Sequence, residues 1–542
     1  MKSVFDRIAE EVMTELLKAE PIRATGLGDH SHDGLLPDYS ASAREQLART
    51  LDDHLAALDA LDDLELESED QADLEILRAA ILRAIFEIRE VRSTTWNPMV
   101  WNPGTGLHAL MSREFAPLEQ RLEAARSRMA AIPHFLASAR RELGEMPRVH
   151  VETAIGQFQG TLHLVNTTLA EHLGAGDEAI AAAGAALEEF VSWLSSQLPL
   201  AHRDPSLGER LYSAVLWHSL DDDTQAGELL AQANSHLLQI ENDLRVVAGQ
   251  YLDEDAGAAE VVARALADVA ARFPVTNRTV LEQVSHSLDR SLDFLREVPL
   301  IDLPVTAVQV IEMPEIHRGV AVAYCDSPGP LEPFDLPTFV AVSPTPEGWE
   351  VERIDSFYRE YNGVQLHDLT IHEAFPGHVL QLAHSRIAER TRRVRAFGRS
   401  SVLIEGWAVY AEELMVNSGY LPADDAKAAL ALRLQQLKMQ ARMTINAILD
   451  VRVHTHDITE QEALDLMMNR GFQEEGEAVG KWRRALLTAG QLPTYFVGYL
   501  AVRAIAQDLH VLHPDWSDQE VHNLMLSHGS PAPRHLRSLL GI

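Results

Sequence analysis

Apolar residues recur at helical spacing through most of this 542-residue chain, and this periodicity constrains the fold more than any other feature. Near the N-terminus, Ser42 and Glu45 form a capping-box pair that starts a run of leucines one turn apart. Such runs are typical of amphipathic helices that pack on one another. We therefore predict a mainly α-helical chain, with helical pattern over residues 42–91, 107–140, 149–296 and 353–542.

One segment, residues 299–348, departs from this pattern. It is rich in proline and contains three runs of alternating or β-branched residues, at 305–313, 319–325 and 338–344. These runs predict a few short strands, and hence one small β element within a helical chain. We expect a helical N-terminal lobe over residues 1–298 and a second lobe over 299–542 that joins the β element to further helices, the two forming one integrated unit.

The formal net charge is −35, from 81 acidic and 46 basic residues. A surface of this sign repels phosphate backbones and anionic lipid, so we expect neither nucleic acid nor a membrane as a partner. Cys325 is the only cysteine, which excludes an internal disulfide and a cysteine-rich zinc knuckle. Residues 1–21 lack the apolar core of a signal peptide, and no stretch reaches the roughly 20 apolar residues that cross a bilayer. We predict a cytoplasmic protein.

Residues 371–381 read IHEAFPGHVLQ, which resembles the start of a HExxH zinc site except that His378 follows His372 by six positions instead of four. In a regular helix six residues rotate by about 600°, some 120° short of two turns, so these imidazoles could not bind one ion. Pro376 cannot continue a regular helix, and Gly377 allows backbone angles that other residues avoid. We predict a bulge here that returns His378 to the face of His372.

A catalytic zinc ion needs three protein ligands and an open position. The helical segment 401–414 supplies Glu405 as a third candidate, and Glu412, on nearly the same helix face, could orient a ligand from behind. Glu373 directly follows the first histidine, as the general base does in HExxH enzymes. On spacing alone, a helix start with solvated glutamates remains the alternative.

Four segments carry a resemblance to a known family: residues 24–40, 311–324, 372–381 and 405–412. In sequence and order they resemble the bacterial family catalogued as domain of unknown function 885, whose signature is HEA-aromatic-PGHH-LQ followed by EGWA-x-Y-x-E. That family is similar to mostly helical HExxH zinc carboxypeptidases of the gluzincin type. The resemblance covers most of the chain and implies a two-lobed helical metallopeptidase-like fold, with a small β-sheet next to the metal-site helix.

By this resemblance, His372, His378 and Glu405 bind Zn2+ and Glu373 is the catalytic base. The family usually carries two adjacent histidines after the Pro-Gly, whereas the second of these positions is Val379 here. The ligand role is therefore assigned to His378.

Two further pairs are candidates for supporting roles. Asp450 and His454 lie four residues apart, so on a helix Asp450 could hold the imidazole of His454 for donation to an oxyanion. A polar pair that simply ends a helix is the alternative. Residues 489–505 resemble another segment of the family, PGQ-x-x-x-Y-x-x-G, which implies that Tyr495 stabilises a tetrahedral intermediate and that Gln491 shapes the pocket.

Other polar clusters are assigned no role in catalysis. Residues 30–33, HSHD, are a rival metal site by composition, but they lie in a glycine-rich loop and are better explained as loop caps. Arg483 and Arg484 could recognise a substrate carboxylate, but arginine pairs are usually surface features.

Together these features predict a zinc-dependent peptidase that hydrolyses short peptides in a carboxypeptidase-like manner. One alternative is a zinc-dependent amidase or other hydrolase of small molecules. The other is a non-catalytic helical scaffold whose metal site has degenerated. The expected partner is a short peptide or small amide substrate, with a homodimer as one option for the assembly.

Overall fold

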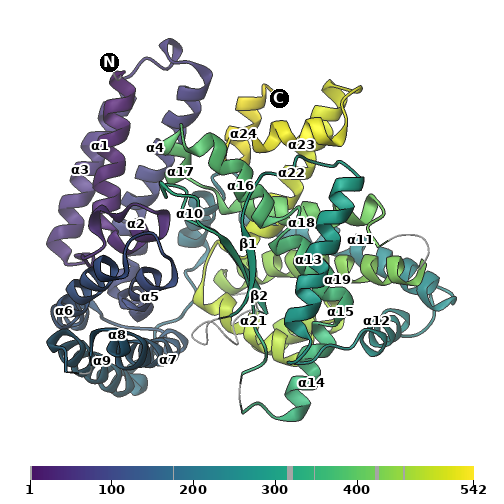
Figure 1. Cartoon of the computed structure of the whole chain (residues 1–542), viewed down its shortest axis with the longest axis horizontal. Coiled ribbons are helices and arrows are strands. Elements are labelled where there is room, and N and C mark those ends of the chain that lie inside the picture. The colour runs from purple at the N-terminus through teal and green to yellow at the C-terminus, as the bar shows by residue number, and fades with distance from the viewer. Residues whose placement is uncertain (1–2, 175, 314–321, 347, 422–425, 456–457) are drawn as a thin grey trace. The chain divides into compact units, whose positions relative to one another are not determined.

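Long helices make up most of the computed structural model, as the periodicity predicted (Figure 1). The structure describes residues 3–174, 176–313, 322–346, 348–421, 426–455 and 458–542. Within these residues the strands form one small three-stranded sheet. The chain divides into two units, which are described separately below.

The first unit comprises Met1–Pro205, Pro328–Leu336 and Glu389–Gly398. Its helices bury two apolar clusters, one that includes Trp101 and Phe158 and one that includes Leu51 and Leu77. These helices are α1 (Val4–Ala19), α2 (Pro21–Leu27), α3 (Ala41–Asp59), α4 (Ser68–Phe86), α5 (Gly104–Ser112), α6 (Leu118–Glu142), α7 (Arg148–Leu164), α8 (Ala170–Leu173), α9 (Glu178–Gln197) and α17 (Arg393–Phe397).

The second unit comprises Ser206–Ser327, Pro337–Ala388 and Arg399–Ile542. Residues 206–298 were expected in the N-terminal lobe, but they belong here because α11 and α12 pack on α19. The helices of this unit are α10 (Glu209–Leu220), α11 (Ala226–Leu252), α12 (Val261–Arg272), α13 (Val280–Glu297), α14 (Val351–Glu360), α15 (Gly363–Glu373), α16 (His378–Glu389), α18 (Ser401–Asn417), α19 (Ala426–His454), α20 (Glu460–Asp465), α21 (Glu475–Leu487), α22 (Pro493–Leu512), α23 (Asp518–Leu526) and α24 (Pro533–Leu540).

The sheet consists of β1 (Val308–Glu312), β2 (Ala323–Asp326) and β3 (Thr338–Val342), in the order β1-β3-β2. The central strand β3 pairs in parallel with β1 and antiparallel with β2. The runs at 305–313 and 338–344 thus contain the predicted strands, whereas part of the run at 319–325 lies outside the described residues. Helix α13 packs on β1 and β3, and α15 packs on the edge strand β2, so the sheet lies beside the helix that carries His372 (Figure 1).

Helix α19 runs through the centre of the second unit, where it packs against α11, α15, α18 and α22. It is buried on nearly every side over residues 431–454, as expected of a helix that is surrounded by other elements. Helices α15, α18 and α22 are thus gathered around α19, and these three helices carry most of the predicted site residues.

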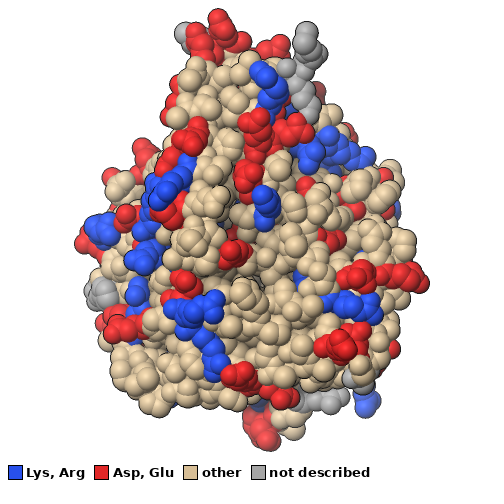
Figure 2. Space-filling model, turned by 90° about the vertical axis from the view of Figure 1, so that its left-hand side faces the viewer, with Lys and Arg blue, Asp and Glu red and all other residues tan. Residues whose placement is uncertain are grey.

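Figure 2 shows acidic and basic side chains interspersed among uncharged ones on the face that it draws. None of the helices in the described part of the chain combines the length and apolar content needed to cross a membrane.

Candidate metal centre

The two histidines lie on two separate helices, joined by a tight turn, and not on one helix with a bulge. Helix α15 ends at Glu373, and α16 begins at His378. The N–H of Gly377 donates to the carbonyl of Ile371 at 3.0 Å, which folds the segment tightly back on the end of α15. A Cβ at Gly377 would lie 2.0 Å from the carbonyl oxygen of His372, so the turn has no room for a side chain. The predicted bulge is therefore corrected to a full break, because the proline and this close approach end the helix.

This break brings three candidate ligands to one point. The imidazole rings of His372 and His378 lie 4.7 Å apart at an interplanar angle of 85°. The Nε2 atom of each ring lies 3.6 Å from Oε2 of Glu405 on α18. The three ligand atoms all lie within 4.8 Å of one another, and two imidazoles plus one carboxylate are a donor set that suits Zn2+. Val379, which follows His378 directly, is buried in the apolar core.

Trp407 ties the turn to the helix that supplies the third ligand. Its indole N–H donates to the carbonyl of Pro376 at 2.8 Å, and its side chain is fully buried. Because Trp407 lies two residues after Glu405 on α18, this hydrogen bond fixes the turn relative to Glu405. The Glu-Gly-Trp motif on α18 is thus fixed in position relative to the turn that follows the His-Glu motif.

Behind the ligands, Glu412 fixes the orientation of His372. Nδ1 of His372 donates to Oε1 of Glu412 at 2.7 Å, which leaves Nε2 directed toward Glu405. Burial lowers the pKa of His372, but the hydrogen bonds to Glu405 and Glu412 outweigh this effect and hold the pKa well above its usual value. The same negative field favours a bound cation.

Glu373 is held beside this centre by the sheet. Its Oε2 accepts the backbone N–H of Cys325 on β2 at 2.8 Å. In an antiparallel pair, successive residues direct their backbone N–H and C=O groups alternately toward the partner strand and away from it. The backbone N–H of Cys325 is directed away from β3 and toward α15. The small sheet thereby positions the predicted base.

Tyr495 lies in the first turn of α22, and Gln491 lies in the loop just before this helix. Burial raises the pKa of the Tyr495 phenol, and the nearby carboxylate of Glu405 raises it further, while a hydrogen bond with Arg484 opposes the rise. The phenol therefore keeps its proton near neutral pH and can donate it. Gln491 accepts a hydrogen bond of 2.8 Å from Nη2 of Arg484, so both predicted residues share one arginine partner.

Asp450 and His454 lie on one face of α19, but they do not form the predicted pair. Oδ2 of Asp450 accepts hydrogen bonds from the Tyr212 hydroxyl and from the N–H of Gly490. Nε2 of His454 donates to the carbonyl of Thr488 at 2.8 Å. Burial raises the pKa of Asp450 to about 7. The structure thus engages both side chains in holding the loop before α22, because partners distant in sequence replace the neighbour four residues away.

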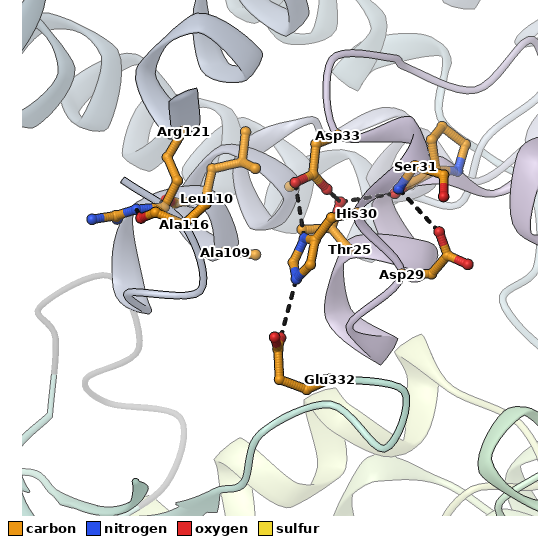
Figure 3. Close-up of polar contacts among 12 residues, drawn as sticks. Thr25, Asp29, His30, Ser31, Asp33, Ala109, Leu110, Ala116, Arg121 and Glu332 are labelled. Atoms are coloured by element: carbon orange, nitrogen blue, oxygen red, sulfur yellow. Dashed lines mark hydrogen bonds and ion pairs between the residues drawn. The ribbon is translucent and has the colours of Figure 1, made fainter. Parts of the chain in front are cut away.

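The rival cluster at residues 30–33 lies in the first unit and is an ion-pair group (Figure 3). Nδ1 of His30 lies 2.9 Å from Asp33, and Nε2 lies 3.1 Å from Glu332. Burial lowers the pKa of His30, but the hydrogen bonds with both carboxylates outweigh it and raise the pKa to about 9. Both ring nitrogens of a protonated His30 are then donors, so neither is available to a metal.

Two further ionisable side chains lie near the centre, and the sequence motifs did not point to them. Asp368 lies one turn before His372 on α15 and is fully buried; burial and the carboxylate of Glu412 raise its pKa well above the usual value. Lys481 on α21 is close enough to Glu405 for the two charges to interact. Asp368 could have been found from its spacing of four to His372, but no motif marks Lys481.

The fold is shared with two solved proteins. One is a candidate lipoprotein of unknown function from Shewanella oneidensis, with 25% identity, a TM-score of 0.84 and coverage of 100% of both chains. The other is a candidate lipoprotein from Colwellia psychrerythraea, with 15% identity, a TM-score of 0.81 and coverage of 100% of this chain and 99% of that one. No curated protein matches the sequence. The family model described as "Bacterial protein of unknown function (DUF885)" matches residues 21–540, so the chain belongs to this family.

Proposed function

We propose that this protein is a zinc-dependent peptidase that acts on short peptides. The observation that carries the proposal is the convergence of the two Nε2 atoms of His372 and His378 on Oε2 of Glu405. Three protein ligands of this kind with a further position left open are typical of a catalytic zinc site. The exposed fractions of these side chains, 11%, 10% and 20%, leave part of each accessible to a ligand.

Zinc held by these residues would supply Lewis-acid polarisation of the scissile carbonyl and of the attacking water. Glu373, held by the N–H of Cys325, takes a proton from that water and delivers it to the leaving amine. The protonated phenol of Tyr495 donates a hydrogen bond to the oxyanion that develops on the carbonyl.

The small sheet beside the predicted base supports a peptide as substrate. Among the described strands β2 pairs with β3, and the N–H of its Cys325 donates to Glu373. An extended peptide that lies beside this sheet would bring its scissile carbonyl near Glu373.

The substitution Glu373→Gln tests the proposal. It preserves shape and metal ligands but removes the base, so we expect unchanged zinc content and a loss of turnover of about 10²–10⁴-fold. The assay is a library of dipeptides and N-acyl amino acids, which also separates a peptidase from an amidase. Glu352→Gln on α14, an exposed glutamate, is the matched control and should keep full activity. Activity that survives Glu373→Gln would remove this residue from the mechanism.

A further inference from the structure

Two cationic side chains lie one turn apart on α21, at Lys481 and Arg484. Both are partly buried, and neither forms an ion pair with any residue that the structure describes. The hydrogen bonds of Arg484 go to uncharged groups, the amide of Gln491 at 2.8 Å and the hydroxyl of Tyr495. Partly buried cations of this kind need an anion nearby.

Neighbouring cations are neutralised by carboxylates. Lys438 pairs with Glu360 at 2.9 Å, and Arg442 pairs with both Glu360 and Glu477 at 3.1 and 3.2 Å. The chain carries 81 acidic residues, so acidic partners are plentiful. Against this background, two adjacent cations that form no ion pair with a described carboxylate indicate a place where an anion from outside the chain can bind.

The two cations lie next to the candidate metal centre. Arg484 contacts Tyr495, whose hydroxyl lies within the field of Glu405 and Glu373. Burial and the charges of Arg484 and Arg442 lower the pKa of Lys481 to about 7, while the carboxylates of Glu477 and Glu405 oppose that shift without forming an ion pair with it. A bound anion between the two side chains would stabilise both of their charged forms.

We propose that Lys481 and Arg484 bind the C-terminal carboxylate of the substrate, so that the enzyme removes single residues from the C-terminal end of short peptides. This inference rests on the proposed function. Tyr495 forms a hydrogen bond with Arg484. In an extended peptide each residue spans about 3.3 Å, so the C-terminal carboxylate lies only one residue from the carbonyl of the last peptide bond. A carboxylate held by Arg484 therefore places the last peptide bond at Tyr495 and the ligands. Hydrolysis breaks its C–N bond, adding OH from water to the acyl carbon and H to the amine.

The test compares a tripeptide that has a free C-terminal carboxylate with the same peptide as its C-terminal amide. We expect the wild-type enzyme to prefer the free acid by at least about tenfold in kcat/KM, since the acid alone forms charge-assisted hydrogen bonds. Arg484→Gln and Lys481→Met should each lower this preference about tenfold. Arg484→Lys, which keeps the charge, should restore part of it. The exposed neighbour Arg483, changed to Gln, is the control and should keep the full preference.

Binding provides a second readout that needs no turnover. Calorimetry on Glu373→Gln protein should show tighter binding of an N-acetyl amino acid than of its amide, and Arg484→Gln should abolish the difference. Equal cleavage of acid and amide by the wild type, or an acid preference that survives in both variants, would overturn the inference while leaving the peptidase intact. If the wild type cleaves no peptide, the proposed function fails, and the binding measurement alone decides whether the anion site exists.

Discussion

Gly406 on α18 and Gly498 on α22 meet backbone to backbone at the point where these helices cross. A Cβ added at Gly498 would lie 2.0 Å from the carbonyl oxygen of Val402 and 2.8 Å from the Cα of Gly406. Tyr495 lies three residues before Gly498 and Glu405 one residue before Gly406, and the carboxylate of Glu405 is close enough to act on the phenol. The glycines of the two motifs are thus needed for close packing, which brings the phenol to the ligands.

The substitution Gly498→Ala should separate these helices. Because the new methyl group meets backbone that cannot move aside, we expect a loss of about 1–3 kcal/mol in the free energy of unfolding, measured by urea titration. Gly480 on α21 is the matched control, since an added Cβ there meets nothing within 4 Å. Gly480→Ala should be neutral or stabilising by up to about 1 kcal/mol. Equal effects at both sites would contradict the close-packing account.

Glu412 should set the metal affinity without binding the metal. Removing the partner of Nδ1 lets the ring of His372 rotate and lowers its basicity, so Glu412→Ala should weaken zinc binding about 10–100-fold. The measurement is competition with a chromophoric chelator. The adjacent Glu413 bonds Tyr499 instead, and Glu413→Gln should leave the affinity unchanged. An unaltered affinity in Glu412→Ala would exclude the orienting role.

The ion-pair group at His30 should make stability depend on pH. The pKa of His30 rises on folding from 6.5 to about 9, so its contribution is complete below pH 6.5 and is lost as the pH rises through 9. Allowing for partial exposure, we expect about 1–3 kcal/mol between these limits. Urea titrations at pH 6 and pH 10 should show this loss in the wild type and in the control His32→Gln, but not in His30→Gln. The same slope in all three proteins would contradict the assignment.

Periodicity and residue type were enough to predict the helices and the small sheet, because these features depend on local spacing. The candidate ligands His372, His378 and Glu405 were assigned from residue type together with the family resemblance, because spacing alone left a simple helix start open. The form of the turn was not predictable to the same degree. Proline signals that a helix stops, but whether the chain bulges or breaks depends on the contacts of Gly377 and Trp407 with distant backbone.

Tertiary partners also explain what the sequence could not show. Asp450 lies on the same face of α19 as His454, yet its carboxylate accepts a hydrogen bond from the hydroxyl of Tyr212, which lies 238 residues away in the chain. Lys481 and Asp368 look like ordinary solvated residues until α15 and α21 are folded, because burial of a charged side chain has no local signature.

The measurement that tests the central claim most directly is elemental analysis of protein purified without chelators, for the wild type and for His378→Ala. The wild type should carry one zinc ion per chain, and His378→Ala should lose it while keeping its helical circular dichroism. A wild-type protein without stoichiometric metal, after zinc has been supplied in excess and the unbound ion removed, would contradict the claim that His372, His378 and Glu405 form a metal site.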